Sequence, residues 1–475
     1  MSISAGKQIK NGFFWSFVEN ISLQVTRFIV GIIMARILSP SDYGLIGMLT
    51  VFIVISDLFV NSGIGTALNQ KNTCSESDYS TAFIFNSIVG FICYIVLFFC
   101  APLIADFYHE ERLIDLLRWL SLVIIIKSFC VVPSVQLQIK LKFKIISVIS
   151  FISSMVLGVS GIAFAYMDYG VWALVYSNII GIAFQLLCYF YFSKWIPKLM
   201  FSLQSFRRLF GYGSRLLVAL LIDVIYSNIY PLVIGRCYTA SQLGYYSRAE
   251  GYSVLPTGTL SSMIYRVCFP VFCKQKDDTV SLIQSYNVMM KSVSYIIIPI
   301  MFVLLILAKP LVLILLTDKW LPCVPYLQVL CLSTLWLPIM EVNYTVIKAL
   351  GNSKSILKMQ LLSKAFAVLV LLVTLKYSVF IMCIGSVIVS IFTLLLNFSI
   401  SVHTINQTII QQCKTITTPV FGGICMMPVF LIMDTELNNY LKLIIGFVVA
   451  LILYYLSTSF LGLSIKRMYY EFKNL

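Results

Sequence analysis

Charged side chains stand inside stretches of this sequence that are otherwise apolar. They are the residues whose chemistry suits the binding of an ion or an ionic ligand. The acids are Glu19, Asp57, Asp223 and Glu341, and the bases are Arg27, Lys127, Arg215, Arg248 and Lys291. A charge surrounded by hydrocarbon is costly, so such residues normally face a water-filled cavity or an opposite charge. We predict that the bases bind an anionic ligand, and that the acids hold a coupling ion or form ion pairs.

Two of the apolar stretches carry an acid and a base at the same separation. Glu19 and Arg27 share the first stretch, and Arg215 and Asp223 share the seventh. In a helix, each pair is separated by roughly 12 Å along the axis and lies on broadly the same side. The alternative role is a structural ion pair between helices, for example Glu19 with Arg215 or Asp57 with Arg27. The sequence leaves both roles open.

Catalytic and metal-binding signatures are missing from the sequence. It contains no P-loop, GxSxG or HExxH pattern, and its 13 cysteines include no CxxC pair. Only 2 histidines are present, which disfavours a zinc site. We therefore predict that the protein is not an enzyme and has no metal or other cofactor, with coupling to an H+ or Na+ gradient as the remaining option.

The elements that carry the charged residues are about fourteen apolar stretches between residues 12 and 462. Apolar residues make up 60% of the chain, charged residues 11%, and the mean hydropathy is +0.94. A hydrocarbon core of about 30 Å takes about 20 apolar helical residues per crossing. The stretches are continuously apolar, whereas the strands of a membrane barrel alternate. We predict an all-α polytopic membrane protein.

The net charge of +15 is distributed unevenly between the loops. Lysines and arginines are concentrated in alternate loops and at both ends of the chain, and the acids are concentrated in the other loops. This is the positive-inside pattern, which predicts that both termini are cytoplasmic and that the number of spans is even. The basic face is expected to contact anionic lipid headgroups rather than nucleic acid.

A turn motif occurs twice in the chain. Residues 35–44 read ARILSPSDYG, and residues 235–244 read GRCYTASQLG. The arginine in second place, the serine in seventh place and the final glycine match. We expect Ser41 and Ser241 to cap the helices that follow. The repetition predicts that spans 1–6 and spans 7–12 are two copies of one unit.

An even number of spans per copy gives both copies the same orientation, as in transporters whose halves enclose a central cavity and rock about it. We predict an N-lobe over residues 1–200, a C-lobe over residues 201–405, and two extra spans with a basic cytoplasmic tail over residues 406–475. Charged residues are concentrated in the first, second and fourth spans of each lobe, whereas spans 5 and 6 contain almost none. The former set is expected to line the cavity.

Several short segments resemble Wzx-type polysaccharide flippases. The resemblance is strongest to the colanic-acid-exporter branch of the polysaccharide transport family, in the multidrug/oligosaccharidyl-lipid/polysaccharide exporter superfamily. The segments are residues 12–16, 35–44, 63–68, 266–272, 277–278, 318–320 and 325–328. The resemblance runs from about residue 5 to residue 400 and fades over the last two spans.

The resemblance implies two six-helix lobes around a central cavity. It also implies that undecaprenyl-diphosphate-linked oligosaccharide repeat units are flipped, by alternating access, from the cytoplasmic to the outer leaflet of a bacterial inner (plasma) membrane. Their use would be the synthesis of lipopolysaccharide, exopolysaccharide or capsule. In the family, cavity cations hold the diphosphate or acidic sugars, and this general role is carried over to the five bases, Arg27, Lys127, Arg215, Arg248 and Lys291. The implied partners are membrane lipids, the lipid-linked glycan, and the glycosyltransferase and polymerase of the same pathway.

Three alternatives to a flippase are compatible with parts of the sequence. An ion-coupled drug antiporter of the same superfamily would have a neutral or acidic cavity, which the bases argue against. A membrane polysaccharide polymerase or ligase would need a large outer loop, and none is predicted. A scaffold for a glycan-assembly complex would give the charges inside the spans little purpose.

Overall fold

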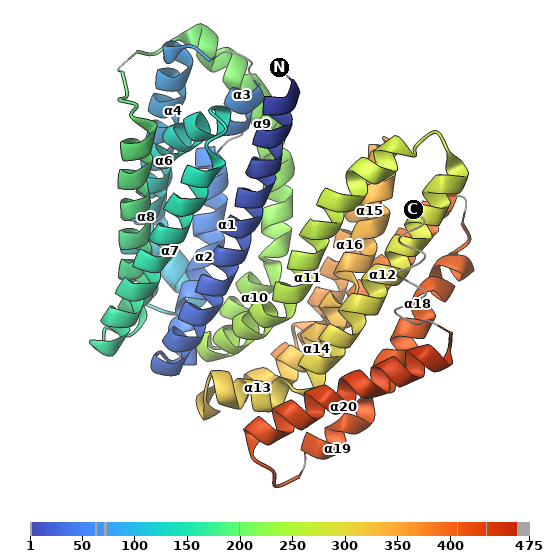
Figure 1. Ribbon diagram of the computed structural model, residues 1–475. Coiled ribbons are helices and arrows are strands. Elements are labelled where there is room, and N and C mark those ends of the chain that lie inside the picture. Colours follow the sequence, from blue (N-terminus) through green and yellow to red (C-terminus); the bar gives the residue numbers. More distant parts are fainter. Residues whose placement is uncertain are drawn as a thin grey trace. The chain divides into compact units, whose positions relative to one another are not determined.

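The computed structural model describes residues 2–61, 64–70, 74–198, 200–405, 407–433 and 435–462, and the secondary structure in these ranges is entirely helical (Figure 1). This confirms the predicted all-α class. Long apolar segments form helices because a helix satisfies its backbone hydrogen bonds internally. The basic tail predicted beyond residue 462 lies outside the described residues. The side chain of Arg215 is also outside them, although the backbone there is helical.

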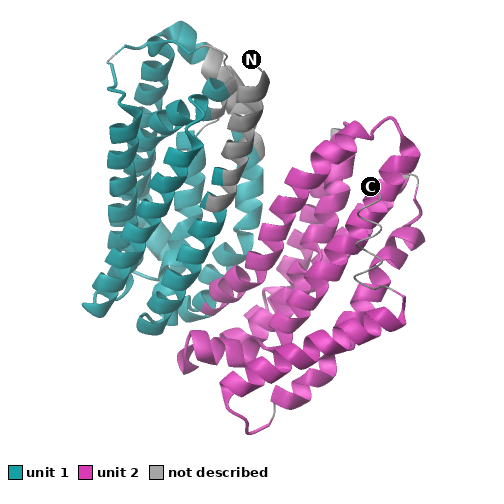
Figure 2. Cartoon of the chain, in the orientation of Figure 1, with its two compact units in different colours: residues 1–244 teal, residues 245–475 magenta. Residues whose placement is uncertain are grey.

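The chain forms two compact units, unit 1 over Met1–Gly244 and unit 2 over Tyr245–Leu475 (Figure 2). The helices of unit 1 are α1 Ser2–Ile37, α2 Pro40–Asn61, α3 Ile64–Gln70, α4 Glu76–Tyr108, α5 Leu113–Leu120, α6 Leu122–Ile139, α7 Phe143–Tyr166, α8 Val171–Ser193, α9 Leu203–Ser227 and α10 Ile229–Cys237. Helix α11, Ala240–Lys274, begins in unit 1 and continues into unit 2.

The helices of unit 2 follow α11. They are α12 Thr279–Ile306, α13 Ala308–Leu315, η1 Asp318–Trp320, α14 Cys323–Thr334, α15 Leu337–Ala349, α16 Ser353–Thr374, α17 Val379–Ile405, α18 Ile409–Ile424, η2 Met427–Val429, α19 Phe430–Met433 and α20 Asn439–Phe460. The predicted lobe boundaries come from the repeated sequence motif. The two compact units are defined by contacts within each unit, so they do not test these boundaries, which stay a prediction.

Small residues let the helices of unit 1 approach one another closely. Helix α7 packs against α1 and α8, and α6 packs against α4 and α8. Gly158 of α7 packs on Val30 of α1, and Gly181 of α8 packs on Leu157 of α7, without room for a Cβ. Such contacts hold helices together where the surrounding lipid provides no hydrophobic driving force between them. In unit 2, α14 and α16 pack on α17, and α12 packs on α14, α15 and α18.

Within the described residues, 12 helical segments are long and apolar enough to cross a membrane, or 13 if α9 and α10 together form one bent span. The multi-pass membrane character is therefore confirmed, whereas the count of fourteen is not. The bend between α9 and α10 is 41°. Helix α11 corresponds to the predicted span 243–272 but is not among the apolar segments. Polar side chains along α11 explain the difference.

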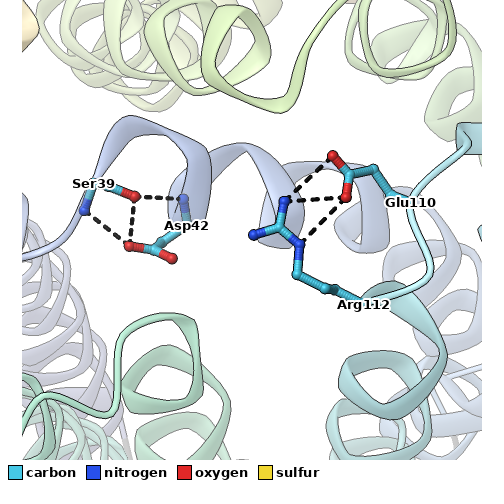
Figure 3. Close-up of polar contacts among 4 residues, drawn as sticks. All are labelled: Ser39, Asp42, Glu110 and Arg112. Atoms are coloured by element: carbon cyan, nitrogen blue, oxygen red, sulfur yellow. Dashed lines mark hydrogen bonds and ion pairs between the residues drawn. The ribbon is translucent and has the colours of Figure 1, made fainter.

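The repeated turn motif forms the same capped helix start in both places. At the start of α2, the Asp42 carboxylate accepts hydrogen bonds from the Ser39 amide and hydroxyl at 2.9 and 2.7 Å, and the Asp42 amide donates to the Ser39 hydroxyl (Figure 3). At the start of α11, Thr239 and Gln242 exchange equivalent bonds of 3.3 Å. The expectation that the serines at the seventh motif position cap these helices was wrong. The helices begin two residues earlier than that role requires, so the caps are Ser39 and Thr239.

The two copies of the motif also contact each other reciprocally. A Cβ on Gly44 would overlap the carbonyl oxygen of Ala240, the first residue of α11. A Cβ on Gly244 would overlap the carbonyl oxygen of Pro40, the first residue of α2. Each glycine therefore packs on the helix start of the other copy. Glycine is required at both positions because the backbones touch.

Candidate functional site

A cavity of about 620 Å³ lies inside unit 1, among helices α1, α2, α6, α7 and α8, with Leu120 at the end of α5. Its polar and charged lining residues are Arg27, Thr50, Asp57, Lys127, Ser150, Ser153, Ser154, Asn178 and Gln185. Apolar residues such as Leu23, Ile46 and Val123 form the rest of the wall. Small-ligand sites commonly have volumes of roughly 300–1,000 Å³ and a few converging polar groups in an apolar wall.

Three of the predicted charged residues meet in this cavity. Asp57 of α2 accepts a hydrogen bond from the ammonium group of Lys127 of α6, and the two form an ion pair. The predicted alternative pair of Asp57 with Arg27 was wrong, because α2 packs against α6 and brings Lys127 to the carboxylate. Arg27 of α1 is exposed and has no ion-pair partner among the residues whose side chains are described. The pair is neutral, so Arg27 leaves the cavity with one net positive charge.

Two polar atoms of the cavity lining are buried without a hydrogen-bond partner in the described structure. They are Oδ1 of Asp57 and the hydroxyl of Ser153. A buried polar atom without a partner is costly, and native proteins usually satisfy it with water or a ligand. The cavity therefore presents one guanidinium, one carboxylate oxygen and at least one hydroxyl to an occupant. A ligand with hydroxyl groups and a negative charge matches this set.

The polar residues of α7 and α8 were missed by the sequence reasoning. It excluded spans 5 and 6 from the lining because they contain almost no charge, but uncharged polar side chains line the cavity from both helices. A signal for them existed. Ser150, Ser153 and Ser154 lie on one face of α7, and Asn178 and Gln185 lie on one face of α8, two turns apart.

Glu19 supports the cavity wall from α1. Its carboxylate accepts a hydrogen bond of 2.7 Å from the hydroxyl of Ser150, which lines the cavity. Glu19 itself is not a lining residue. Its predicted pairing with Arg215 concerns a side chain outside the described residues, so that pairing stays a prediction.

The other predicted residues do not line this cavity. Asp223 is an exposed residue of α9, and Lys291 is a partly buried residue of α12. The guanidinium of Arg248 on α11 lies over the ring of Trp320, 5.9 Å from its centroid. On α15, Glu341 forms an ion pair of 3.6 Å with Lys348. Their assignment to substrate or ion binding stays a prediction.

Comparisons with known sequences point to glycan assembly. A family model described as "Polysaccharide biosynthesis protein" matches residues 33–325. The teichuronic acid biosynthesis protein TuaB of Bacillus subtilis (strain 168) is 26% identical over 353 residues, which are 74% of this chain and 73% of that protein. The lipopolysaccharide biosynthesis protein WzxC of Escherichia coli (strain K12) is 28% identical over 332 residues, which are 68% of this chain and 66% of that protein.

Comparisons with solved structures show the fold. The lipid II flippase MurJ in an inward closed conformation aligns with a TM-score of 0.75 and 16% identity, covering 94% of this chain and 98% of that chain. An inward-facing multidrug resistance transporter of the MATE family and MOP superfamily aligns with a TM-score of 0.59 and 12% identity, covering 81% and 95%. By their titles the first is a flippase and the second a transporter, and at such identities the likeness concerns the fold alone.

Proposed function

This chain belongs to the polysaccharide biosynthesis protein family, and we propose that it flips lipid-linked oligosaccharide repeat units across the membrane. The proposed substrate is an undecaprenyl-diphosphate-linked oligosaccharide destined for lipopolysaccharide, exopolysaccharide or capsule. The name of one relative, the succinoglycan biosynthesis transport protein ExoT of Rhizobium meliloti (strain 1021), joins polysaccharide synthesis to transport. The structural likeness to the lipid II flippase MurJ supports a fold suited to such a task.

The observation that carries the proposal is the polar cavity inside unit 1. A glycan and its diphosphate cannot cross hydrocarbon at a useful rate, because every hydroxyl and charge must first lose its water. The cavity offers Arg27 for a negative group, and Ser153 and Asp57 for hydroxyl groups, inside a unit made of membrane-spanning helices. A polar ligand held there exchanges its water for protein hydrogen bonds.

The proposed cycle is alternating access in a bacterial inner membrane, with both termini cytoplasmic. The polar head enters from the cytoplasmic side and leaves towards the outer leaflet, while the lipid tail stays in the bilayer. An H+ or Na+ gradient supplies the driving force. A glycosyltransferase that completes the lipid-linked unit must act before this protein, and a polymerase that consumes the flipped unit must act after it.

The direct test measures the leaflet distribution of lipid-linked oligosaccharide in cells from which this gene is deleted, with and without a plasmid-borne copy of it. We expect the intermediate to accumulate on the cytoplasmic face without the gene, and to reach the outer face when the wild-type copy is supplied. Arg27→Ala should reproduce the defect. Arg112→Ala is the matched control, because Arg112 does not line the cavity and forms a surface pair of 3.1 Å with Glu110 (Figure 3).

A different outcome would replace the proposal. If the intermediate reaches the outer face in cells without the gene but remains unpolymerised, the protein acts after flipping. If Arg27→Ala flips at the wild-type rate while the deletion does not flip, the protein is a flippase but this cavity does not hold the negative group.

A further inference from the structure

A carboxyl group in unit 2 lacks the paired cation that Asp57 and Glu341 have. Asp57 is paired with Lys127, and Glu341 is paired with Lys348. Glu250 of α11 is partly buried, and its hydrogen-bond partner is the neutral phenol of Tyr246, at 3.3 Å. Among the described residues, no Lys or Arg lies within ion-pair distance of Glu250.

Glu250 stands on a polar stripe that runs along α11. Tyr246, Ser253 and Thr257 lie at helical spacings of four and three residues from it and from each other, so they share its face of the helix. Ser253 and Thr257 are fully buried. The stripe faces α14, because the hydroxyl of Thr334 donates to the Ser253 carbonyl oxygen at 3.4 Å. It consists of groups that both donate and accept hydrogen bonds.

The ionisable groups around Glu250 leave its charge uncompensated. Arg248 is on the same helix, but residues two apart do not face each other, and its guanidinium lies over Trp320 next to the thiol of Cys323. On the α17 side, the thiol of Cys383 lies within electrostatic range of the carboxyl. The described neighbours are thus a phenol and thiols, which are neutral near pH 7 and do not stabilise a carboxylate as a cation would.

We propose that Glu250 is the group that takes up and releases the coupling proton during transport. This proposal rests on the proposed flippase function. An enclosed carboxylate without a cation is unfavourable, whereas the neutral acid needs only hydrogen bonds, which Tyr246 provides. The group is partly exposed, so water can deliver the proton and remove it again. Protonation neutralises Glu250, and release of the proton restores its negative charge.

A proton fits this site better than a metal cation. Hard cations bind several oxygen ligands at once. In the described part of the chain, no group of three or more His, Cys, Asp or Glu side chains is placed to hold a metal ion. The carboxyl of Glu250 has one side-chain oxygen, that of Tyr246, within hydrogen-bond distance.

Chemical labelling of the purified full-length protein tests the proton site without measuring transport. Dicyclohexylcarbodiimide modifies carboxyl groups that are protonated and shielded from water, and mass spectrometry locates the product. We expect Glu250 to be labelled at about pH 6 and the yield to fall about tenfold or more by about pH 9, as the carboxyl loses its proton. Glu341 is the comparison acid in the same unit and should be labelled less than Glu250, because the neighbouring Lys348 ammonium, at 3.6 Å, opposes its protonation.

Two labelling results overturn the proposal. If Glu250 is labelled no more than Glu341 at every pH, its carboxyl is not a shielded acid. If sodium chloride blocks the labelling and choline chloride does not, the site binds Na+ instead.

A transport experiment links the site to coupling. In cells, Glu250→Gln should slow flipping about tenfold or more and remove its sensitivity to a protonophore, whereas Glu250→Asp should retain that sensitivity. Glu110→Gln, a change in the surface pair with Arg112, is the control. If the Glu250→Gln protein flips at the wild-type rate and is still inhibited by a protonophore, the proposal is contradicted. If Glu250 is labelled as expected but the protein flips no glycan, the proton site is supported and the proposed flippase function is wrong.

Discussion

At the scale of single residues, the structure decides which charges neutralise each other. Asp57 had two cations within plausible reach, and the packing of α2 on α6 selected Lys127. The choice has a functional consequence, because it leaves Arg27 as the charge that the cavity presents to an occupant. An ion pair inside a helical bundle fixes geometry more than it adds stability.

Removing one partner of the pair should cost more than removing both. We expect Asp57→Asn and Lys127→Met each to lower the free energy of unfolding by about 1–3 kcal/mol, and the double variant to lose less than the sum. The value lies below that of a fully buried pair because the Lys127 side chain is 35% exposed. Thermal unfolding of the purified variants measures the coupling. Strictly additive losses would mean that the two charges act independently.

Replacing Ser153 distinguishes a ligand-binding role of its hydroxyl from a structural role. Its hydroxyl has no partner in the described structure, so Ser153→Ala should leave the melting temperature unchanged or slightly higher. If the hydroxyl binds the glycan, the same variant should flip about tenfold more slowly, the effect of losing one buried hydrogen bond. Ser160→Ala is the matched control on α7, because the Ser160 hydroxyl donates to the Val156 carbonyl oxygen. Equal flipping by both variants would remove Ser153 from the site.

At the scale of elements, the repeated turn explains why both motifs end in glycine. The capping bonds fix where α2 and α11 begin, and the glycine four residues into each helix lets its backbone touch the start of the other helix. A glycine inside a helix normally costs stability relative to alanine. Here the close approach outweighs that cost.

The close contact at Gly244 gives a stability prediction for α11. Gly244→Ala should lower the free energy of unfolding by about 1–3 kcal/mol, because the new methyl group overlaps the Pro40 carbonyl and the helices must separate. Gly251 lies about two helical turns further along α11. A Cβ at this position has no other atom within 4 Å, so Gly251→Ala should be neutral or stabilising. Thermal unfolding of both variants in the same detergent is the measurement. A Gly244→Ala protein as stable as Gly251→Ala would show that the contact yields without cost.

At the scale of the whole molecule, α11 decides the number of membrane crossings. The described residues contain 12 or 13 apolar segments, and the predicted even count of fourteen requires that α11 also crosses despite its polar stripe. A polar helix crosses a membrane when its polar face is buried against other helices, and Ser253 and Thr257 are fully buried.

Reporter fusions test whether α11 crosses. An alkaline phosphatase domain fused after Tyr238, just before α11, should be active outside the cytoplasm, and one fused after Lys276, just beyond α11, should be inactive inside it. The same series should place both termini in the cytoplasm. Reporters on the same side at these two positions would show that α11 does not span, and the positive-inside orientation of the later loops would have to be revised.

The sequence by itself determined the membrane class and the helices. Helix formation in an apolar stretch depends on neighbours along the chain, and so does a capped turn such as that of Ser39 and Asp42. The pattern also identified Arg27, Asp57 and Lys127, because a charge within an apolar run is conspicuous. Uncharged polar residues such as Ser153 and Gln185 are less conspicuous, since a membrane helix accommodates them on any face.

Only the tertiary structure decided which of these residues meet. The rotation of each helix about its axis and its choice of neighbour depend on contacts between residues far apart in the sequence, such as α2 with α6 and α1 with α7. Those contacts paired Asp57 with Lys127, opened a cavity against α7 and α8, and left Glu250 beside a phenol instead of a cation. A local pattern carries no information on such partners, because rotating a helix part of a turn about its axis changes the neighbours of each side chain while the sequence stays the same.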